Sequence, residues 1–216
     1  MGLRHHIYGA MVAAALLVVV GLPAPVAAED DDQRDTLQER YASTDGRMFA
    51  HLTTSTIVRD DFYRSFGVGF DGGYFPSEDW GLELRLRQHF TSLSHTGQQM
   101  FEDHEMVPDM RAPDTTLEAG GRLSWGYGKV LTLGDFVVHF DPQLLAHGGL
   151  TLAEERIVPK ISGGIGFLTH WRWGIQAKLD LQISVHFEQR DRGVVPATGF
   201  VPLLGVGWSP GWGDSE

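Results

Sequence analysis

An unbroken alternation of apolar and polar residues is the feature that most constrains this fold. Between Trp173 and Phe187, every odd-numbered position is Trp, Ile, Ala, Leu, Val or Phe, and every even-numbered position is Gly or polar. Successive side chains of a β-strand point to opposite faces, so this period of two predicts a strand with one apolar and one polar face. The stretch from Trp80 to Phe90 repeats the pattern, with leucines on one face and mostly charged residues on the other.

Six further segments alternate less strictly and bring the number of candidate strands to eight. They span Met48 to Val58, Phe66 to Tyr74, Leu117 to Tyr127, Phe136 to His147, Ile161 to Thr169 and Phe200 to Trp208. An even number of antiparallel strands suits closure into a barrel. Tight turns alternate with the long polar connection Ser94 to Pro113 and the moderately long Gln189 to Thr198, as in outer-membrane barrels. The connection Gly126 to Gly134 is longer than the other turns on its side.

The N-terminus has the pattern of an export signal. Arg4 precedes an uncharged apolar run from Ile7 to Leu22, and Val26-Ala27-Ala28 supplies small residues for signal peptidase. The run is shorter than the ~20 apolar residues of a membrane anchor, so we predict cleavage after Ala28. The domains predicted are therefore a signal peptide at 1–28, an acidic periplasmic segment at 29–45, a barrel at 46–208 and a polar tail at 209–216.

Composition excludes several function classes. The 216 residues contain no Cys, which rules out disulfide frameworks, thiol catalysis and Cys-ligated zinc. The formal net charge of −11 disfavours binding to nucleic acid, which requires a basic face. An apolar share of 42% is too high for a disordered chain. We expect no cofactor and no metal.

The polar faces favour a transmembrane barrel over a soluble one. Their mid-strand charges alternate in sign, as expected for a lumen filled by ion pairs. Ten strand steps of about 3.3 Å, tilted by about 45°, give roughly 23 Å, close to the ~25 Å apolar band of membrane barrels. The fold class predicted is all-β, an eight-stranded antiparallel transmembrane β-barrel.

This fold assigns a role to each face. The predicted lumen network comprises Glu83, Arg85, Arg87, His89, Glu118, Arg122, His139, Asp141, Lys178, Asp180 and His186. The predicted lipid-facing residues are Leu82, Leu84, Leu86, Leu179, Leu181 and Ile183. The predicted aromatic girdle comprises Trp80, Phe90, Trp125, Trp173, Phe187 and Trp208.

A series of glycine and aromatic motifs resembles a known family. Asp60-Asp61-Phe62-Tyr63, Gly72-Gly73-Tyr74-Phe75, Tyr127-Gly128-Lys129, His139-Phe140-Asp141 and Gly163-Gly164-Ile165-Gly166 occur in this order. The series resembles the outer-membrane β-barrel domain family best represented in myxobacteria and related Gram-negative bacteria. The resemblance covers about Arg47 to Phe187 and implies a small exported barrel without catalytic residues. Pro142 stands where the family usually has an aliphatic residue, and we expect a bulge or local break there.

Possible enzymatic and metal sites are weak. Gly67-Val68-Gly69-Phe70-Asp71-Gly72 matches G-x-G-x-x-G, but no helix pattern follows, so we predict a strand with small inward positions near Arg85. Ser184 and His186 share a face with Asp180, yet they point into the predicted lumen, away from lipid substrates. His139, Asp141 and His147 fit lumen packing better than a metal site, and the acidic, His-containing long loop fits a solvated surface.

The function predicted is that of a non-enzymatic outer-membrane protein of a Gram-negative bacterium, an envelope scaffold or interaction protein that displays the Ser94–Pro113 loop. Its expected partner is outer-membrane lipid. A narrow channel for small solutes and a soluble periplasmic barrel with an apolar ligand remain alternatives. The channel requires a gap among the lumen charges, and the soluble barrel requires the leucine faces to line a cavity. An enzyme is the weakest alternative.

Overall fold

The computed structural model describes residues 43–59, 63–104, 112–132, 136–153, 156–171, 174–190 and 193–210. The predicted signal peptide, most of the acidic segment and most of the polar tail lie outside these residues. The elements are β1 (Arg47–Ile57), β2 (Tyr63–Phe75), β3 (Trp80–Leu93), α2 (His95–His104), β4 (Pro113–Ser124), β5 (Gly128–Thr132), β6 (Phe136–Ala153), β7 (Arg156–His170), β8 (Ile175–Arg190) and β9 (Gly193–Trp208).

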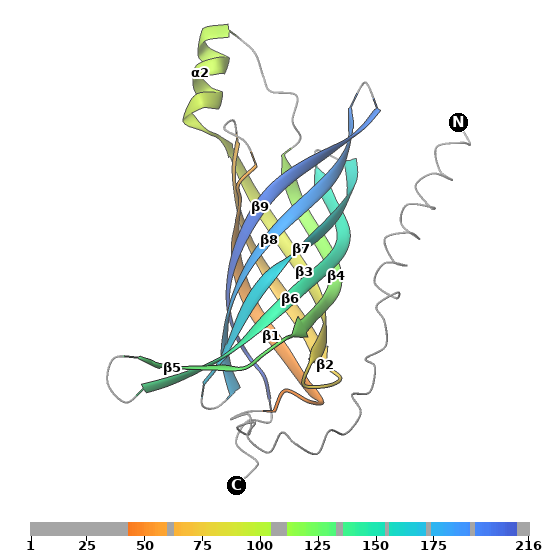
Figure 1. Ribbon diagram of the computed structural model, residues 1–216. Coiled ribbons are helices and arrows are strands. Elements are labelled where there is room, and N and C mark those ends of the chain that lie inside the picture. Colours follow the sequence, from red (N-terminus) through yellow and green to blue (C-terminus); the bar gives the residue numbers. More distant parts are fainter. Residues whose placement is uncertain are drawn as a thin grey trace, which may run out of the picture.

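Eight of the strands form a closed antiparallel ring. Neighbours follow the order β4-β3-β2-β1-β9-β8-β7-β6, and β4 also pairs with β6, which closes the sheet on itself. The first and last strands meet through the β1–β9 pairing from Ala50↔Trp208 to Ser55↔Leu203. The predicted eight-stranded antiparallel barrel is therefore confirmed, and Figure 1 shows its tilted strands around a common axis.

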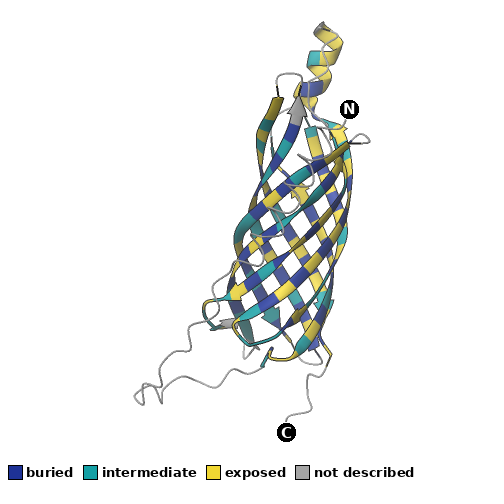
Figure 2. Cartoon of the chain, turned by 90° about the vertical axis from the view of Figure 1, so that its right-hand side faces the viewer, coloured by how far each residue is buried: buried dark blue, intermediate teal, exposed yellow. Residues whose placement is uncertain are grey.

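Alternation along each strand separates the inside of the barrel from the outside. Along β3, buried and exposed residues alternate without exception from Gly81 to Phe90. Figure 2 shows the same alternation of buried and exposed residues across the whole ring. The buried positions carry the polar residues of the sequence pattern, and the exposed positions carry the large apolar ones.

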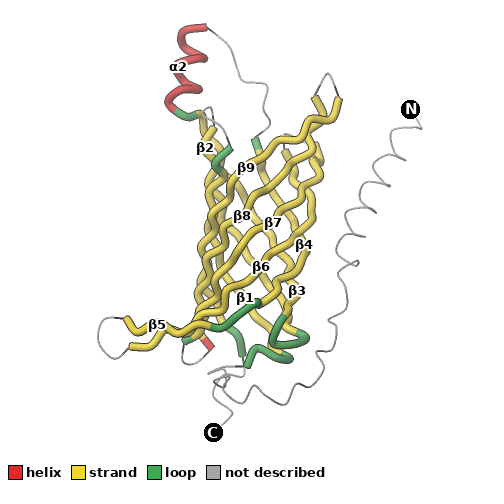
Figure 3. The backbone as a smooth tube through the Cα atoms, viewed as in Figure 1, coloured by secondary structure: helices red, strands yellow, loops and turns green. Residues whose placement is uncertain are grey.

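The short strand β5 is the one described strand outside the ring. It pairs with the first residues of β6, from Gly128↔Phe140 to Thr132↔Phe136, and this ribbon projects sideways from the barrel (Figures 1 and 3). It accounts for the length of the 126–134 connection, which the sequence pattern left unexplained. The bulge expected at Pro142 does not occur on the β7 side, where Pro142 pairs with Phe167 without a shift in register. The break lies on the other edge of β6, where its partner changes from β5 to β4.

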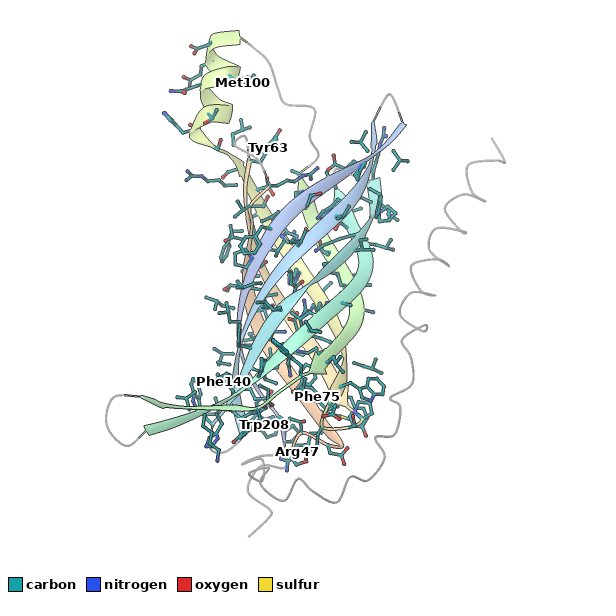
Figure 4. The ribbon with its side chains drawn as sticks, viewed as in Figure 1. Arg47, Tyr63, Phe75, Met100, Phe140 and Trp208 are labelled. Atoms are coloured by element: carbon teal, nitrogen blue, oxygen red, sulfur yellow. The ribbon has the colours of Figure 1, made fainter. Side chains whose placement is uncertain are left out.

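The two ends of the barrel differ. We call the end where β1 begins and β9 ends the terminal end, and the end that carries α2 the helix end; Figure 4 labels Arg47, Phe75, Phe140 and Trp208 near the first, and Tyr63 and Met100 near the second. The connection predicted as a polar loop contains α2, whose first turn is capped by Ser94 Oγ accepting from Gly97 N at 3.2 Å. The expected loop from Gln189 to Thr198 is mostly strand, because β8 runs to Arg190 and β9 begins at Gly193.

Within the described part of the chain, no helix has the length and apolar character needed to cross a membrane.

Candidate functional site

Buried ion pairs fill the middle of the barrel. Glu83 lies at their centre: its carboxylate accepts from Arg122 Nη1 at 3.1 Å, from Lys178 Nζ at 2.6 Å and from Arg85 Nε at 2.8 Å. Asp71 and Asp180 supply the second carboxylates for these cations, with Lys178 Nζ–Asp71 Oδ2 at 2.5 Å and Arg122 Nη2–Asp180 Oδ1 at 2.9 Å. We call Asp71, Glu83, Arg85, Arg122, Lys178 and Asp180 the Glu83 cluster.

A second, smaller group lies toward the helix end. Glu118 Oε2 accepts from Arg87 Nη1 at 3.0 Å, whereas Glu118 Oε1 accepts from Ser162 Oγ at 2.8 Å and lies 3.1 Å from Lys160 Nζ. We call Arg87, Glu118, Lys160 and Ser162 the Glu118 cluster. Each of its three charged side chains is almost fully buried. A buried charge is tolerated when it is paired and hydrogen-bonded, and both clusters meet that condition for their carboxylates.

The terminal end of the interior is apolar. Phe49, Phe75 and Leu168 form a buried cluster there, with the two phenylalanine rings 4.9 Å apart between centroids. Beside it, Asp141 pairs with His170 at 3.2 Å, and Gln176 contacts His170 at 3.2 Å. Side chains from seven strands, β1 to β4 and β6 to β8, therefore pack the interior from the middle of the barrel to its terminal end.

The structure places ten of the eleven predicted lumen residues inside the barrel. Those buried in the interior are Glu83, Arg85, Arg87, His89, Glu118, Arg122, Asp141, Lys178, Asp180 and His186. His139 differs: it is only partly buried and forms a hydrogen bond and a ring contact with Tyr127. The reason is topological, because at His139 β6 has run past the end of β4 and pairs with Lys129 of β5.

Several interior residues were not in the predicted network. Asp71 belongs to the Glu83 cluster, Lys160 belongs to the Glu118 cluster, and His51 is 1% exposed. His147, which the sequence placed in the lumen without including it in the network, lies 3.1 Å from Glu83. The alternation places Asp71 and His51 on inward positions of their strands, so both residues could have been predicted from the sequence pattern. Lys160 was missed because the predicted strand began one residue later, at Ile161, whereas β7 begins at Arg156 and continues through Pro159.

The predicted exterior residues lie on the outside of the ring. Leu82, Leu84, Leu86, Leu179 and Ile183 are exposed, and Leu181 is partly exposed. Of the predicted aromatic residues, Phe90, Trp125 and Trp208 are exposed, Trp80 and Phe187 are partly exposed, and Trp173 lies outside the described residues. Trp80 begins β3 and Trp208 ends β9, so both lie at the terminal end.

The geometry does not support a dinucleotide-binding site or a Ser-His-Asp triad. The G-x-G-x-x-G run lies inside β2 rather than before a helix, and the nearest long side chain is Arg87, whose Cγ lies 2.5 Å from an added Cβ on Gly69. Ser184 Oγ and His186 Nε2 are 3.5 Å apart, but Asp180 is engaged with Arg85 and Arg122. Among the residues that the structure describes, no group of three or more His, Asp or Glu is arranged to hold a metal ion.

No family model matches the chain, and no curated protein matches it either. Solved structures similar to it include a de novo designed transmembrane β-barrel and Neisserial surface protein A. The designed barrel is 11% identical, with a TM-score of 0.38, and the match covers 76% of this chain and 96% of that one. Neisserial surface protein A is 8% identical, with a TM-score of 0.41, and the match covers 78% of this chain and 97% of that one.

Proposed function

We propose that this protein is a non-enzymatic barrel of a Gram-negative outer membrane, and that it acts as a scaffold displaying the α2 connection. The observation that carries the proposal is the inverted distribution of polarity. Arg85, Arg87 and Arg122 are the largest fully buried side chains, whereas Leu52 and Phe90 are 71% and 61% exposed. An exposed apolar belt of this size is unfavourable in water, whereas it is favourable in contact with the hydrocarbon of a membrane.

The same distribution argues against a soluble barrel with an apolar ligand. That function needs Leu82, Leu84 and Leu179 to line an internal cavity, and all three side chains lie on the outside. A channel is disfavoured because side chains fill the interior of the barrel. The Glu83 cluster spans the barrel from β2 and β3 to β4 and β8, and Phe49, Phe75 and Leu168 pack on its side toward the terminal end.

Gel mobility and conductance test the closed membrane barrel. Unheated protein in SDS should migrate differently from boiled protein, because closed membrane barrels keep their sheet until heated. Insertion into a planar bilayer should give no discrete current steps. Stepwise conductance would replace the scaffold with a channel, and a protein that needs no detergent and shows no mobility shift would overturn the membrane location.

Single-cysteine labelling tests whether the helix end of the barrel faces the outside of the cell. Gln99 is exposed on α2 and Lys129 is exposed on β5 at the opposite end, and the chain contains no Cys of its own. We expect a membrane-impermeant maleimide to label Gln99→Cys on intact cells, and Lys129→Cys only after the outer membrane is permeabilised. The Lys129→Cys variant is the matched control, and the reverse order of labelling would overturn the proposed orientation.

A further inference from the structure

The ribbon formed by β5 and the start of β6 has no covering layer within the ring. β5 pairs with β6 from Gly128↔Phe140 to Thr132↔Phe136, and it pairs with no other described strand. β6 first meets β7 at His139, so the residues before His139 form a two-stranded ribbon. Figures 1 and 3 show this ribbon projecting away from the barrel. An isolated two-stranded ribbon is marginally stable at best in water, so a surface outside the ring should support it.

The sequence of the ribbon is apolar on both faces. From Val130 to Val138 the chain reads Val-Leu-Thr-Leu-Gly-Asp-Phe-Val-Val, in which Asp135 is the only charged residue. Val130 pairs with Val138, and the next position, Leu131, pairs with Val137. Successive positions of a strand belong to opposite faces of a sheet, so each face receives an apolar pair. Apolar surroundings therefore suit both faces of the ribbon, whereas the strands of the ring need them on one face only.

Exposed aromatic residues and a lysine lie at the end of the barrel from which the ribbon projects. Trp125 lies just before the ribbon and is 65% exposed, and Trp208, which ends β9, is 54% exposed. Tyr127 forms a hydrogen bond with His139, and Lys129 Nζ lies 5.8 Å from the centroid of the Tyr127 ring. In membrane proteins, aromatic rings gather at the level of the lipid headgroups, and lysines there extend their ammonium groups toward water. The residues around the base of the ribbon are therefore typical of a membrane–water interface.

The direction of the ribbon also fits this layer. The ribbon runs across the barrel axis rather than along it, at the end where Phe140 and Trp208 lie (Figures 3 and 4). In a barrel that crosses a membrane, such a ribbon runs along the membrane surface. One edge of β5 has no strand partner among the described residues, and unpaired backbone groups are not tolerated in hydrocarbon. At the interface, water and headgroups can pair with this edge while acyl chains contact the apolar residues.

From this arrangement we infer that the β5–β6 ribbon is a lipid anchor that lies in the headgroup layer of the leaflet at the terminal end. Its partner is the phospholipid surface around the barrel, and it extends the contact of the barrel with that surface on one side only. The inference rests on the proposed membrane location, but it holds whichever end of the barrel faces the outside of the cell.

Fluorescence quenching of single labelled cysteines measures the depth of the ribbon. The chain has no Cys, so Val130→Cys carries a single environment-sensitive nitrobenzoxadiazole label in the full-length mature protein. The protein is inserted into vesicles of phosphatidylethanolamine and phosphatidylglycerol. The quenchers are a shallow nitroxide near the lipid headgroup, a deep nitroxide near the end of the acyl chain, and iodide in the water. Reference labels are placed by Leu84→Cys, exposed near the middle of β3, and by Gln99→Cys, exposed on α2.

The label at Val130 should be quenched most strongly by the shallow nitroxide, the label at Leu84 by the deep nitroxide, and the label at Gln99 by iodide. If the Val130 label responds to iodide as the Gln99 label does, while the Leu84 label responds to the deep nitroxide, the anchor is overturned and the membrane location stands. A Val130 label shielded from all three quenchers would mean contact with protein, a second copy of this chain included, and would also overturn the anchor. If neither nitroxide quenches the Leu84 label, the membrane location fails and the anchor fails with it.

A charged variant tests whether the apolar residues hold the ribbon in the membrane. Val137→Asp combined with Val138→Asp adds two charges beside the label at Val130, and Asp is among the residues that membranes tolerate least. This variant should replace quenching by the shallow nitroxide with quenching by iodide. Thr96→Asp combined with Gln98→Asp is the matched control, because it adds the same charges at exposed positions of α2. The control should leave the response of the Val130 label unchanged.

Folding of both variants is checked by the heat-dependent gel shift. A folded charged variant that keeps the shallow quenching of the unsubstituted ribbon would overturn the anchor. If the charged variant does not fold, the depth of the Val130 label in the otherwise unchanged chain still decides the question.

Discussion

At the residue scale, Glu83 is the side chain on which the interior depends most. It contacts Arg85, Arg122, Lys178 and His147, all within 3.1 Å. Removing one partner from a buried ionic network leaves charges unpaired at a cost of about 3–5 kcal/mol. We therefore expect Glu83→Gln to lower the free energy of unfolding by about 3–5 kcal/mol, measured by urea titration in lipid vesicles.

A double-mutant cycle separates this cost from a general packing defect. Lys178 donates to Glu83 at 2.6 Å, so Glu83→Gln together with Lys178→Gln removes one anion and one cation at once. The double variant should be more stable than the sum of the two single changes predicts, because it leaves fewer unpaired charges. Strictly additive effects would mean that the two residues are not energetically linked, contrary to the geometry.

Sequence periodicity identifies inward residues well but says little about their partners. Glu83, Arg85 and Lys178 lie on perfectly alternating strands, and burial follows from that pattern. Their mutual contacts depend on the register between strands distant in sequence, such as β3 with β8, which meet only across the closed ring. His139 shows the opposite limit: the alternation places it inward, yet it lies where β6 no longer pairs with β4 and pairs instead with Lys129 of β5 and His170 of β7.

At the scale of elements, the prediction succeeds where a strand alternates uniformly and fails where proline interrupts the pattern or where a segment carries too few apolar residues. β3 and β8 begin within two residues of their predicted starts. β7 and β9 begin at Arg156 and Gly193, before their predicted starts at Ile161 and Phe200, and the missed residues include Pro159 and Pro196, which disfavour a strand in the sequence pattern but are paired here. α2 was missed because Met100 and Phe101 are its only large apolar residues and make no helical stripe, and β5 was missed because five residues are too few to establish a period.

The β5–β6 ribbon is separable from the ring. The described residues of this ribbon, 128–132 and 136–138, make no pairing with β4 or β7, and Tyr127 and His139 are already in contact at its base. Deleting 128–138 should leave a barrel that still shows the heat-dependent gel shift, with a free energy of unfolding within about 1 kcal/mol of the full chain, as for changes outside a packed core. Failure of the deleted chain to fold would show that the ribbon helps to close the ring.

At the scale of the whole molecule, a barrel that spans a membrane must be apolar where its outer surface meets hydrocarbon and can be polar where it meets water. Leu84 lies near the middle of β3, with 56% of its surface exposed. Val194 is similarly exposed, at 55%, but lies in the β8–β9 hairpin, where β9 pairs with β8 alone. The two side chains therefore have equal exposure at very different positions along the barrel.

Substituting arginine at these two positions should show whether the outer surface of the barrel faces lipid or water. On a lipid-facing strand, Arg costs about 2–4 kcal/mol near the midplane and about 0–1 kcal/mol near the interface. In lipid vesicles, Leu84→Arg should lower the free energy of unfolding by the larger amount and Val194→Arg by the smaller one. Surface substitutions on a soluble protein usually stay within about 0.5 kcal/mol wherever they lie. Equal, small effects at both positions would therefore place the leucine face in water, whereas a graded cost locates the hydrocarbon layer around the middle of the ring.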